Sequence, residues 1–497
     1  SLDALIASTV PEAIAIKSAL ELDGPLTENA ALAKLKAIAE QNGTAKSFIG
    51  LGYYDTFTPN VILRNVLENP SWYTAYTPYQ PEISQGRLEC LLNFQQMTLD
   101  LTAMDLANAS LLDEATAAAE AMSLAKRVSK NRAANKFFVD RQCLPQTIDV
   151  IKTRAECFGF ELVIGDINDA DLSELFGAIF QYPAVTGEAR DLTEVISQLH
   201  EHKAIAIVAA DLMSLTLLKP PGEMGADVVT GTTQRFGVPM GYGGPHAAYF
   251  ATKEDYKRAV PGRIIGVSID KRGRQAFRMA LQTREQHIRR EKANSNICTA
   301  QVLLANISAL YAMYHGPKGL KNIAQRIHRL TSIMAAGLQN AGIEIVNENF
   351  FDTLTLKVDA GDIAAILDRA KMKKINLRID TVEQDQSIGI SLDECSSSKD
   401  VENIWRIILG NAAQKLSAAD IDAQIVSGEK AAVIPDNLIR HSKYLQHHNF
   451  NSYHSETEMM RYLKKLEDKD ISLTHSMIAL GSCTMKLNAS AEMLPIS

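Results

Sequence analysis

The sequence predicts an α/β fold in which a mostly parallel sheet is covered by helices on both faces. Between residues 115 and 250, short segments that are apolar throughout alternate with segments of helical periodicity. Continuously apolar strands are typical of a sheet buried on both sides, because half-exposed strands alternate apolar and polar residues. The strands are expected at residues 136–139, 161–164, 178–180, 204–208, 227–229 and 246–250.

Helices are expected between these strands and before them. The first forty residues place apolar side chains at helical spacing, with a break at residues 23–25, and predict two short helices in an N-terminal arm. An alanine-rich helix is expected over 115–130 and another over 147–157. Residues 71–82 are rich in Tyr, Pro and Gln, which disfavours a regular helix and indicates a loop with a function.

A smaller α+β domain is expected after the His-Gly-Pro sequence at 315–317. Its predicted helices are 320–339, 362–371 and 399–409, its strands fall within 343–358, 375–378 and 388–390, and a charged helix follows at 455–468. The expected units are an N-terminal helical arm (1–50), a large α/β domain (51–317), a small α+β domain (318–415) and a final segment (416–497) that begins with a linker.

Composition excludes several classes of protein. The 497 residues are 46% hydrophobic and 22% charged, which is ordinary for globular domains. The formal net charge of −7 gives no chain-wide basic field for nucleic acid or an anionic membrane. Six scattered cysteines without a CxxC pair indicate neither a zinc site nor a disulfide framework, and the apolar runs are shorter than the ~20 residues of a membrane span. We expect a soluble protein from a reducing compartment, without a metal.

A glycine-rich segment at residues 233–246 follows an expected strand. Glycines at this density allow backbone to approach a ligand or a neighbouring chain closely, although a tight crossover loop without a ligand explains them equally well. The segment matches neither GxxxxGK[ST] nor GxGxxG. It is therefore a candidate site of unspecified chemistry.

Carboxylates mark two further positions. Asp211 ends the apolar strand, where it can pair with a protonated pyridine nitrogen or cap the next segment. Asp113 and Glu114 begin the alanine-rich helix, at a helix N-terminus where a phosphate would otherwise fit. Two carboxylates there satisfy the helix dipole and repel a phosphate, so capping is the favoured interpretation.

The basic run at 284–292 carries interleaved carboxylates and indicates a solvated or interface face.

Seven motifs carry a resemblance to a known family. They are TPYQPEISQGR at 77–87, ASLLDE at 109–114, PPGEMGAD at 220–227, QRFGVPMGYGGPH at 234–246, QTREQHIRREK at 282–292, YHSETE at 453–458 and GSCTMKLN at 481–488. On these motifs the chain closely resembles the N-terminal half of the P-protein of the glycine cleavage system, the glycine dehydrogenase (decarboxylating) family.

The resemblance implies a fold-type-I architecture for pyridoxal-phosphate enzymes, with a large seven-stranded domain and a small domain. It implies glycine decarboxylation with aminomethyl transfer to the lipoyl group of the H-protein. In this family two homologous halves, fused or separate, form one unit, and the second half holds the lysine that binds the cofactor. Residues 481–488 resemble the opening of that second half, so the chain is expected to be a fragment of a fused protein, with a separate subunit as the alternative.

Alignment with the family places Gln234 or Arg235 where the Schiff-base lysine would stand. A guanidinium stays charged and an amide is not nucleophilic, so neither forms an imine. Asp211, Asp113 and Glu114 are then vestiges of a cofactor site, and pyridoxal 5'-phosphate is expected only in the second half. The source compartment is expected to be the bacterial cytoplasm, or the mitochondrial matrix in a eukaryote, and the assembly a dimer of the two-half unit.

We expect this half to complete the active site of its partner. The residues expected to line that site are Tyr76, Thr77, Tyr79, Gln80, Glu82, Ser482, Thr484 and Lys486. For the tyrosines, packing at the interface is the alternative, and Lys486 equally suits a surface position. Two other functions stay open: a half that chiefly docks the H-protein, and an independent aminotransferase-like enzyme that uses another lysine such as Lys219.

Overall fold

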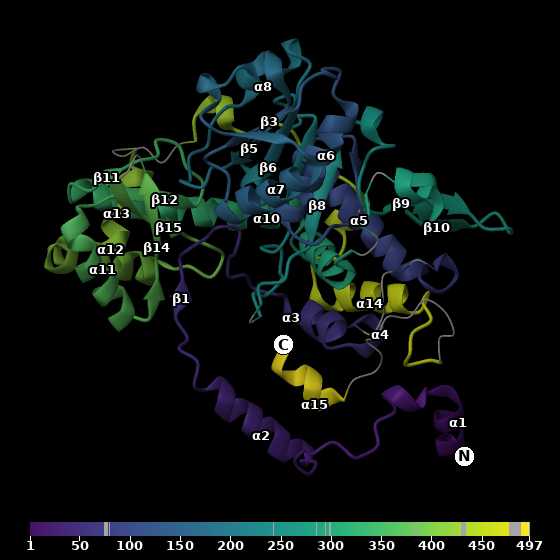
Figure 1. Ribbon diagram of the computed structural model, residues 1–497. Coiled ribbons are helices and arrows are strands. Elements are labelled where there is room, and N and C mark those ends of the chain that lie inside the picture. The colour runs from purple at the N-terminus through teal and green to yellow at the C-terminus, as the bar shows by residue number, and fades with distance from the viewer. Residues whose placement is uncertain are drawn as a thin grey trace.

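The computed structural model describes residues 1–73, 78, 80–241, 243–284, 286–293, 295–297, 300–382, 385–428, 434–476 and 489–496. At its centre lies a seven-stranded sheet with the order β2-β8-β7-β6-β5-β3-β4 (Figure 1). The five strands from β4 to β7 run parallel, whereas β8 and β2 are antiparallel to their neighbours. The strands are β2 Leu106–Ala107, β3 Lys136–Asp140, β4 Glu161–Gly165, β5 Leu175–Tyr182, β6 Ile205–Ala210, β7 Val228–Thr232 and β8 Ala248–Thr252. The predicted fold class is confirmed.

Helices cover both faces of this sheet. Neighbouring residues of one strand belong to different cores: Phe137 packs in one hydrophobic cluster and Phe138 in the other. Both side chains are fully buried, although they point to opposite faces of the sheet. The strands are therefore apolar at every position and do not alternate between apolar and polar residues. The surrounding helices are α5 Gln85–Thr102, α6 Glu114–Val128, α7 Pro145–Phe158, α8 Thr193–Glu201 and α10 Val302–Asn340, and α10 is kinked at Gly316.

The small domain contains a second, antiparallel sheet. Its order is β11-β12-β15-β14, and it lies to one side of the large sheet (Figure 1). A two-residue strand at the end of the N-terminal arm, β1 Lys46–Ser47, pairs with β13 Ile375–Asn376 and connects the arm to this domain. The other elements are β11 Glu344–Ile345, β12 Thr353–Lys357, β14 Arg378–Val382, β15 Asp385–Ser391, α11 Ala360–Met372, α12 Ser398–Leu409 and α13 Ala418–Val426.

The N-terminal arm forms two helices, as predicted. They are α1 Leu2–Thr9 and α2 Glu28–Ala39, and neither contains a buried residue. Ser1 and Thr27 cap them through side-chain oxygens. Figure 1 shows both helices standing away from the body of the molecule.

Two features differ from the expectations. Residues 71–73 belong to a short helix, α4 Pro70–Tyr73, which begins with a proline. The prediction of a loop over 71–82 is therefore wrong for its first three residues. Residues 264–280 form an unpredicted hairpin of β9 Ile264–Ile269 and β10 Gln275–Ala280.

The remaining helices are α3 Asn60–Ile62, α9 Gln286–Arg289, α14 Glu456–Glu467 and α15 Ser490–Met493. In the described part of the chain, no helix combines the length and apolarity that crossing a membrane requires.

Candidate functional site

Arg235, one of the two residues that the family alignment places at the lysine position, lies buried beyond the carboxyl end of β7. Its guanidinium Nη1 donates to Asp211 Oδ2 at 2.8 Å and to Asp352 Oδ2 at 2.6 Å. The guanidinium carbon lies 3.9 Å from the centroid of the Tyr54 ring, in the range of a cation–π contact. Side-chain exposure is 3% for Arg235 and 5% for Asp352, so this ion cluster is largely removed from water.

Each member of the cluster comes from a different part of the fold. Asp211 directly follows β6, and its carboxylate also accepts the N–H groups of Met213 and Ser214 at 3.2 and 3.1 Å. Asp352 precedes β12 of the small domain, and Tyr54 lies in the segment between β1 and α3. The cluster therefore joins the large sheet, the small sheet and the N-terminal segment. For Asp211 the capping alternative occurs, and the carboxylate also pairs with Arg235, a partner that was not anticipated; the expected pairing with a pyridine nitrogen stays a prediction.

The charges explain why Arg235 is chemically inert here. Burial alone lowers the pKa of Arg235, but Asp211 and Asp352 outweigh burial and hold that pKa above its ordinary value. Burial raises the pKa of Asp211, against the effect of Arg235, and burial also raises the pKa of Tyr54. Arg235 is thus a permanent cation that offers no free amine.

Gln234, the alternative lysine position, has a structural task. Its Oε1 accepts the N–H of Tyr54 at 3.0 Å, and its Nε2 donates to the carbonyls of Tyr54 at 2.8 Å and Val238 at 2.7 Å. The side-chain amide thus binds the backbone of Tyr54 as a neighbouring strand would. This pairing holds the Tyr54 ring against Arg235.

The two carboxylates at the start of α6 behave differently from each other. Asp113 is the N-cap and accepts the N–H of Thr116 at 2.7 Å, as predicted. The capping role predicted for Glu114 is wrong: its buried carboxyl faces Gln181 and Thr147, and no hydrogen bond to its Oε1 is found in the described part of the chain. Burial raises the pKa of Glu114 to about 7. Only Asp113 therefore occupies the helix N-terminus as a carboxylate cap.

Two glycines of the 233–246 segment have packing roles. A Cβ at Gly237 would lie 2.7 Å from Cδ2 of Tyr311, and one at Gly244 would lie 2.5 Å from Cε1 of Tyr53. Both residues also have positive φ, at 77° and 59°. The close approach of the two tyrosine rings explains why these positions are glycine. At these two positions the structure therefore favours a tight loop without a ligand.

Most of the predicted partner-facing residues lie outside the described residues: Tyr76, Thr77, Tyr79, Ser482, Thr484 and Lys486. Gln80 is half-buried and Glu82 is exposed, just before α5. Lys219, the alternative lysine, donates to Thr193 Oγ1 at 3.0 Å and pairs with Asp191 at 3.6 Å. It therefore belongs to a different group of side chains from Arg235.

Sequence reasoning did not identify Tyr54 or Asp352. Tyr54 lies in a short glycine-containing stretch, and its contacts are with residues 180 positions away. Asp352 precedes a buried strand, and an aspartate in such surroundings needs a cation nearby. The need of a buried aspartate for a cation was the one signal in the sequence that pointed to Asp352. It does not tell which Lys or Arg supplies the charge.

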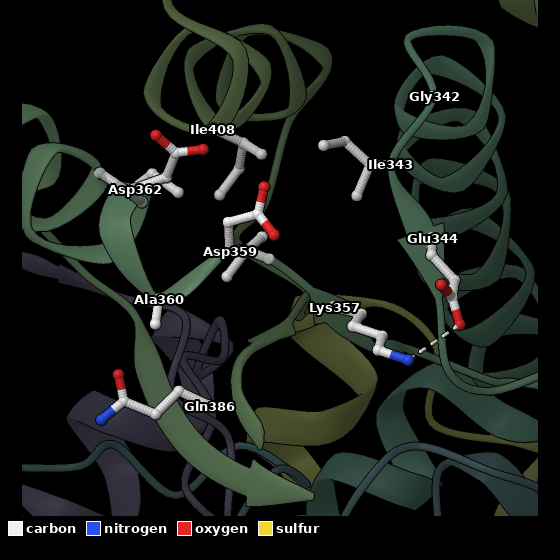
Figure 2. A pocket seen from close by; sticks show the side chains of 11 residues that line it. Gly342, Ile343, Glu344, Lys357, Asp359, Ala360, Asp362, Gln386 and Ile408 are labelled. Carbon is white, nitrogen blue, oxygen red and sulfur yellow. Dashed lines mark ion pairs between the residues drawn. The ribbon is translucent and has the colours of Figure 1, made fainter.

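A hollow of about 430 Å³ lies on the small domain, away from these residues. Figure 2 shows the carboxylates of Asp359 and Asp362 there, with an ion pair of 3.8 Å between Lys357 and Glu344. None of its lining residues belongs to the Arg235 cluster. Across the described ranges, no group of three or more His, Cys, Asp or Glu side chains is placed to hold a metal ion.

A family model and two curated relatives all relate this chain to the same family. A family model described as glycine cleavage system P-protein matches residues 1–408. The chain is 63% identical over 497 residues to a glycine dehydrogenase (decarboxylating) of Stutzerimonas stutzeri (strain A1501), and 60% identical over 499 residues to one of Idiomarina loihiensis. Each alignment covers the whole chain and 51% of the relative. The chain thus spans about half the length of these curated relatives.

Solved structures agree with these matches. The crystal structure of a glycine decarboxylase (P-protein) of the glycine cleavage system, in inhibitor-bound form, is 31% identical with a TM-score of 0.74. That alignment covers 82% of this chain and 94% of the solved chain. Glutamate decarboxylase of Lactobacillus brevis is 12% identical with a TM-score of 0.58, covering 83% of this chain and 96% of the other, which shows a shared fold alone.

Proposed function

The chain belongs to the glycine cleavage system P-protein family, and from this premise we propose that it is the half of a glycine decarboxylase that binds no pyridoxal phosphate itself. Its architecture is that of the fold-type-I pyridoxal-phosphate enzymes. The proposed whole enzyme decarboxylates glycine and passes the aminomethyl group to the lipoyl group of an H-protein. In this proposal the second homologous half supplies the lysine and the cofactor.

One observation carries the proposal: the ion pair between Arg235 and Asp211. Binding the cofactor in this fold calls for a lysine amine, a carboxylate free to face the pyridine nitrogen, and a helix N-terminus open to phosphate. Here Arg235 replaces the amine and engages the carboxylate of Asp211, while Asp113 caps α6. The residues of this chain therefore do not fit pyridoxal phosphate.

The loop before α5 is our candidate for the part that completes the partner's active site. Its proposed lining residues are Tyr76, Thr77, Tyr79, Gln80 and Glu82, with Ser482, Thr484 and Lys486 from the far end of the chain. The structure supports a fixed exit from this loop, because Gly86 N–H donates to Asp470 Oδ1 at 2.7 Å and Arg87 pairs with Asp470 at 2.8 Å. In this proposal, side chains ahead of that fixed point orient glycine and exclude water in the neighbouring half.

A half that mainly docks the H-protein is the second candidate function. Under that alternative, substitution of Tyr76 and Tyr79 changes the KM for H-protein and spares glycine-driven CO2 exchange. An independent enzyme that uses Lys219 is disfavoured, because Asp191 and Thr193 already hold that amine.

Reductive trapping tests the proposal directly. The purified chain is mixed with pyridoxal phosphate and reduced with borohydride, and lysines are examined by intact mass and peptide mapping. We expect no site-specific pyridoxyl-lysine, and glycine decarboxylation only after the second half is added. A stoichiometric adduct at one lysine, together with activity of the chain alone, would overturn the proposal.

A further inference from the structure

The β9–β10 hairpin projects from the body of the protein (Figure 1). Among the described residues its two strands pair only with each other. Its turn is well formed: the carboxylate of Asp270 accepts the N–H groups of Arg272 and Arg274 at 2.7 and 2.9 Å, and Gly273 takes a φ of 75°. A two-stranded ribbon is marginally stable by itself, so its root must be supported.

Two glutamines of α5 support that root. Gln95 Oε1 accepts the N–H of Ile265 at 2.8 Å, and its Nε2 donates to the Ile265 carbonyl at 3.1 Å. Gln85 makes the same pair of bonds to Phe277 of the other strand, at 2.8 and 2.9 Å. Each strand is thus held by one side-chain amide of the same helix. The hairpin is fixed in direction, although no described residue of the body pairs with the strands at its tip.

On one face of the hairpin, β9 carries apolar side chains from root to tip. Near the root, Ile265 and its cross-strand partner Met279 are 4% and 9% exposed. Toward the tip, Val267 and Ile269 follow Ile265 on the same face, because strand residues two apart share a side, and they are 60% and 74% exposed. The apolar strip therefore continues beyond the part of the body that covers it.

The hairpin is also basic in an acidic chain. Residues 264–280 contain four Lys and Arg and one Asp, whereas the whole chain has a net charge of −7. Lys271, Arg272 and Arg274 are exposed, and none of them forms an ion pair with another described residue. Such a cluster of free cations attracts an acidic surface over about 8–10 Å at physiological salt.

We propose that this hairpin is the docking arm for an acidic partner protein, the carrier of the lipoyl group. Charge complementarity identifies the partner as acidic, and the pair Val267 and Ile269 gives it an apolar contact. A permanent interface with the second half would be larger and more apolar and would be depleted in lysine. Two apolar side chains beside three free cations instead suit a transient, electrostatically steered partner.

The hairpin's location suits a carrier, and this step rests on the proposed function. Gln85, which holds β10, comes directly after the loop proposed to line the active site of the second half. A carrier bound at the hairpin would therefore place its lipoyl arm near that loop. Docking and group transfer would use adjacent parts of one helix, α5.

Charge reversal in the two-half enzyme tests the proposal. The variant Lys271→Glu, Arg272→Glu, Arg274→Glu is compared with a control of equal charge change, Lys318→Glu, Lys321→Glu, Lys415→Glu, at exposed positions on α10 and after α12. We expect the hairpin variant to raise the KM for lipoylated carrier about tenfold or more at low salt, with the KM for glycine unchanged. The wild-type KM should rise with salt, and the variant should lose most of that dependence.

A second variant tests the apolar part of the surface. Val267→Thr with Ile269→Thr keeps β-branched residues in the strand, so it should preserve the hairpin. It should speed dissociation of the carrier in a direct binding measurement without changing the salt dependence.

Three outcomes would overturn either the docking proposal or the proposed function on which it rests. If the unmodified two-half enzyme shows no carrier-dependent release of CO2 from glycine, the proposed function fails. If it does, but the hairpin and control variants have the same carrier KM, the docking proposal fails alone. Loss of binding between the two halves in the hairpin variant would overturn the docking proposal also, and would assign the hairpin to the interface between the halves.

Discussion

Nη1 of Arg235 donates to Oδ2 of Asp211 at 2.8 Å, and under the proposed function this bond takes the place of one to a pyridine nitrogen. A protonated pyridine nitrogen and a guanidinium both present an N–H donor with positive charge to a carboxylate. Asp211, whose side chain is 18% exposed, therefore has a cationic partner that the protein itself supplies. Under the proposed function, the fold keeps this charge balance without binding the cofactor.

Removing that cation should unfold the protein more easily. Arg235→Ala leaves the buried Asp352 and the partly buried Asp211 together without a counter-charge, and breaking a buried ion cluster costs about 3–5 kcal/mol of unfolding free energy. Urea unfolding at neutral pH measures this loss. Arg272→Ala, at an exposed position, is the control and should change the free energy of unfolding by less than about 0.5 kcal/mol. A similar small effect for both variants would show that the cluster contributes nothing to stability.

Restoring a lysine should not restore cofactor binding. Arg235→Lys puts an amine at the right position, but Asp211 and Asp352 would hold it as an ammonium, and Tyr54 would still lie beside it. We expect no pyridoxyl adduct at residue 235 after borohydride reduction. An adduct at this position would mean that the single arginine is what excludes the cofactor.

The sequence was sufficient for the large sheet but not for the cluster. Residues such as Phe137 and Phe138 are both buried, and this two-sided burial is visible as an uninterrupted apolar run. The meeting of Tyr54, Asp352 and Arg235 depends on tertiary contacts over more than 100 positions and leaves no periodic signal. The family motifs pointed to Gln234 or Arg235, and the strand pattern pointed to Asp211, whereas Tyr54 and Asp352 came from geometry.

The β9–β10 hairpin was missed for a different reason. Ile265, Val267 and Ile269 form an ordinary strand pattern, but Lys271, Arg272 and Arg274 make the turn resemble the charged surface of a helix. The support for the strands comes from Gln85 and Gln95, about 170 to 190 positions earlier. Helix-borne amides that pair with strand backbone have no recognised sequence signature.

The N-terminal arm should be dispensable for the stability of this half. No residue of α1 or α2 is buried, and the hydrogen bonds of residues 1–45 are local. Deletion of residues 1–45 should therefore leave the midpoint of thermal unfolding unchanged within about 2 °C. It should also reduce light scattering by the isolated half, because large apolar side chains such as Leu22 and Ile16 are more than three-quarters exposed. A clear fall in the midpoint would show that the arm packs on the body in solution.

Glu114 should make stability depend on pH. Its pKa is about 7 in the folded chain and 4.5 is its ordinary value, so the folded state binds the extra proton between these limits. The contribution of neutral Glu114 is complete below about pH 4.5 and is lost as the pH rises through 7. Glu114→Gln should remove this loss and make the chain more stable than wild type at pH 8, by up to about 3 kcal/mol.

Urea unfolding at pH 5 and pH 8 checks the effect of Glu114→Gln, with Glu201→Gln at an exposed position as the control. The difference between Glu114→Gln and wild type should be larger at pH 8 than at pH 5. An equal difference at both pH values would mean that Glu114 ionises in the folded chain as readily as in the unfolded chain.

Two glycines with the same backbone angle allow packing to be separated from strain. Gly237 has a φ of 77° and Gly273 a φ of 75°, but only Gly237 has a neighbour where a Cβ would be, at 2.7 Å from Tyr311. Gly273→Ala should cost about 1 kcal/mol of unfolding free energy, which is the expense of positive φ alone. Gly237→Ala should cost about 1–3 kcal/mol more, because the Tyr311 ring must move within a packed core. Chemical denaturation of both variants measures the difference, and equal costs would show that Tyr311 yields freely and that the glycine is needed only for its backbone angle.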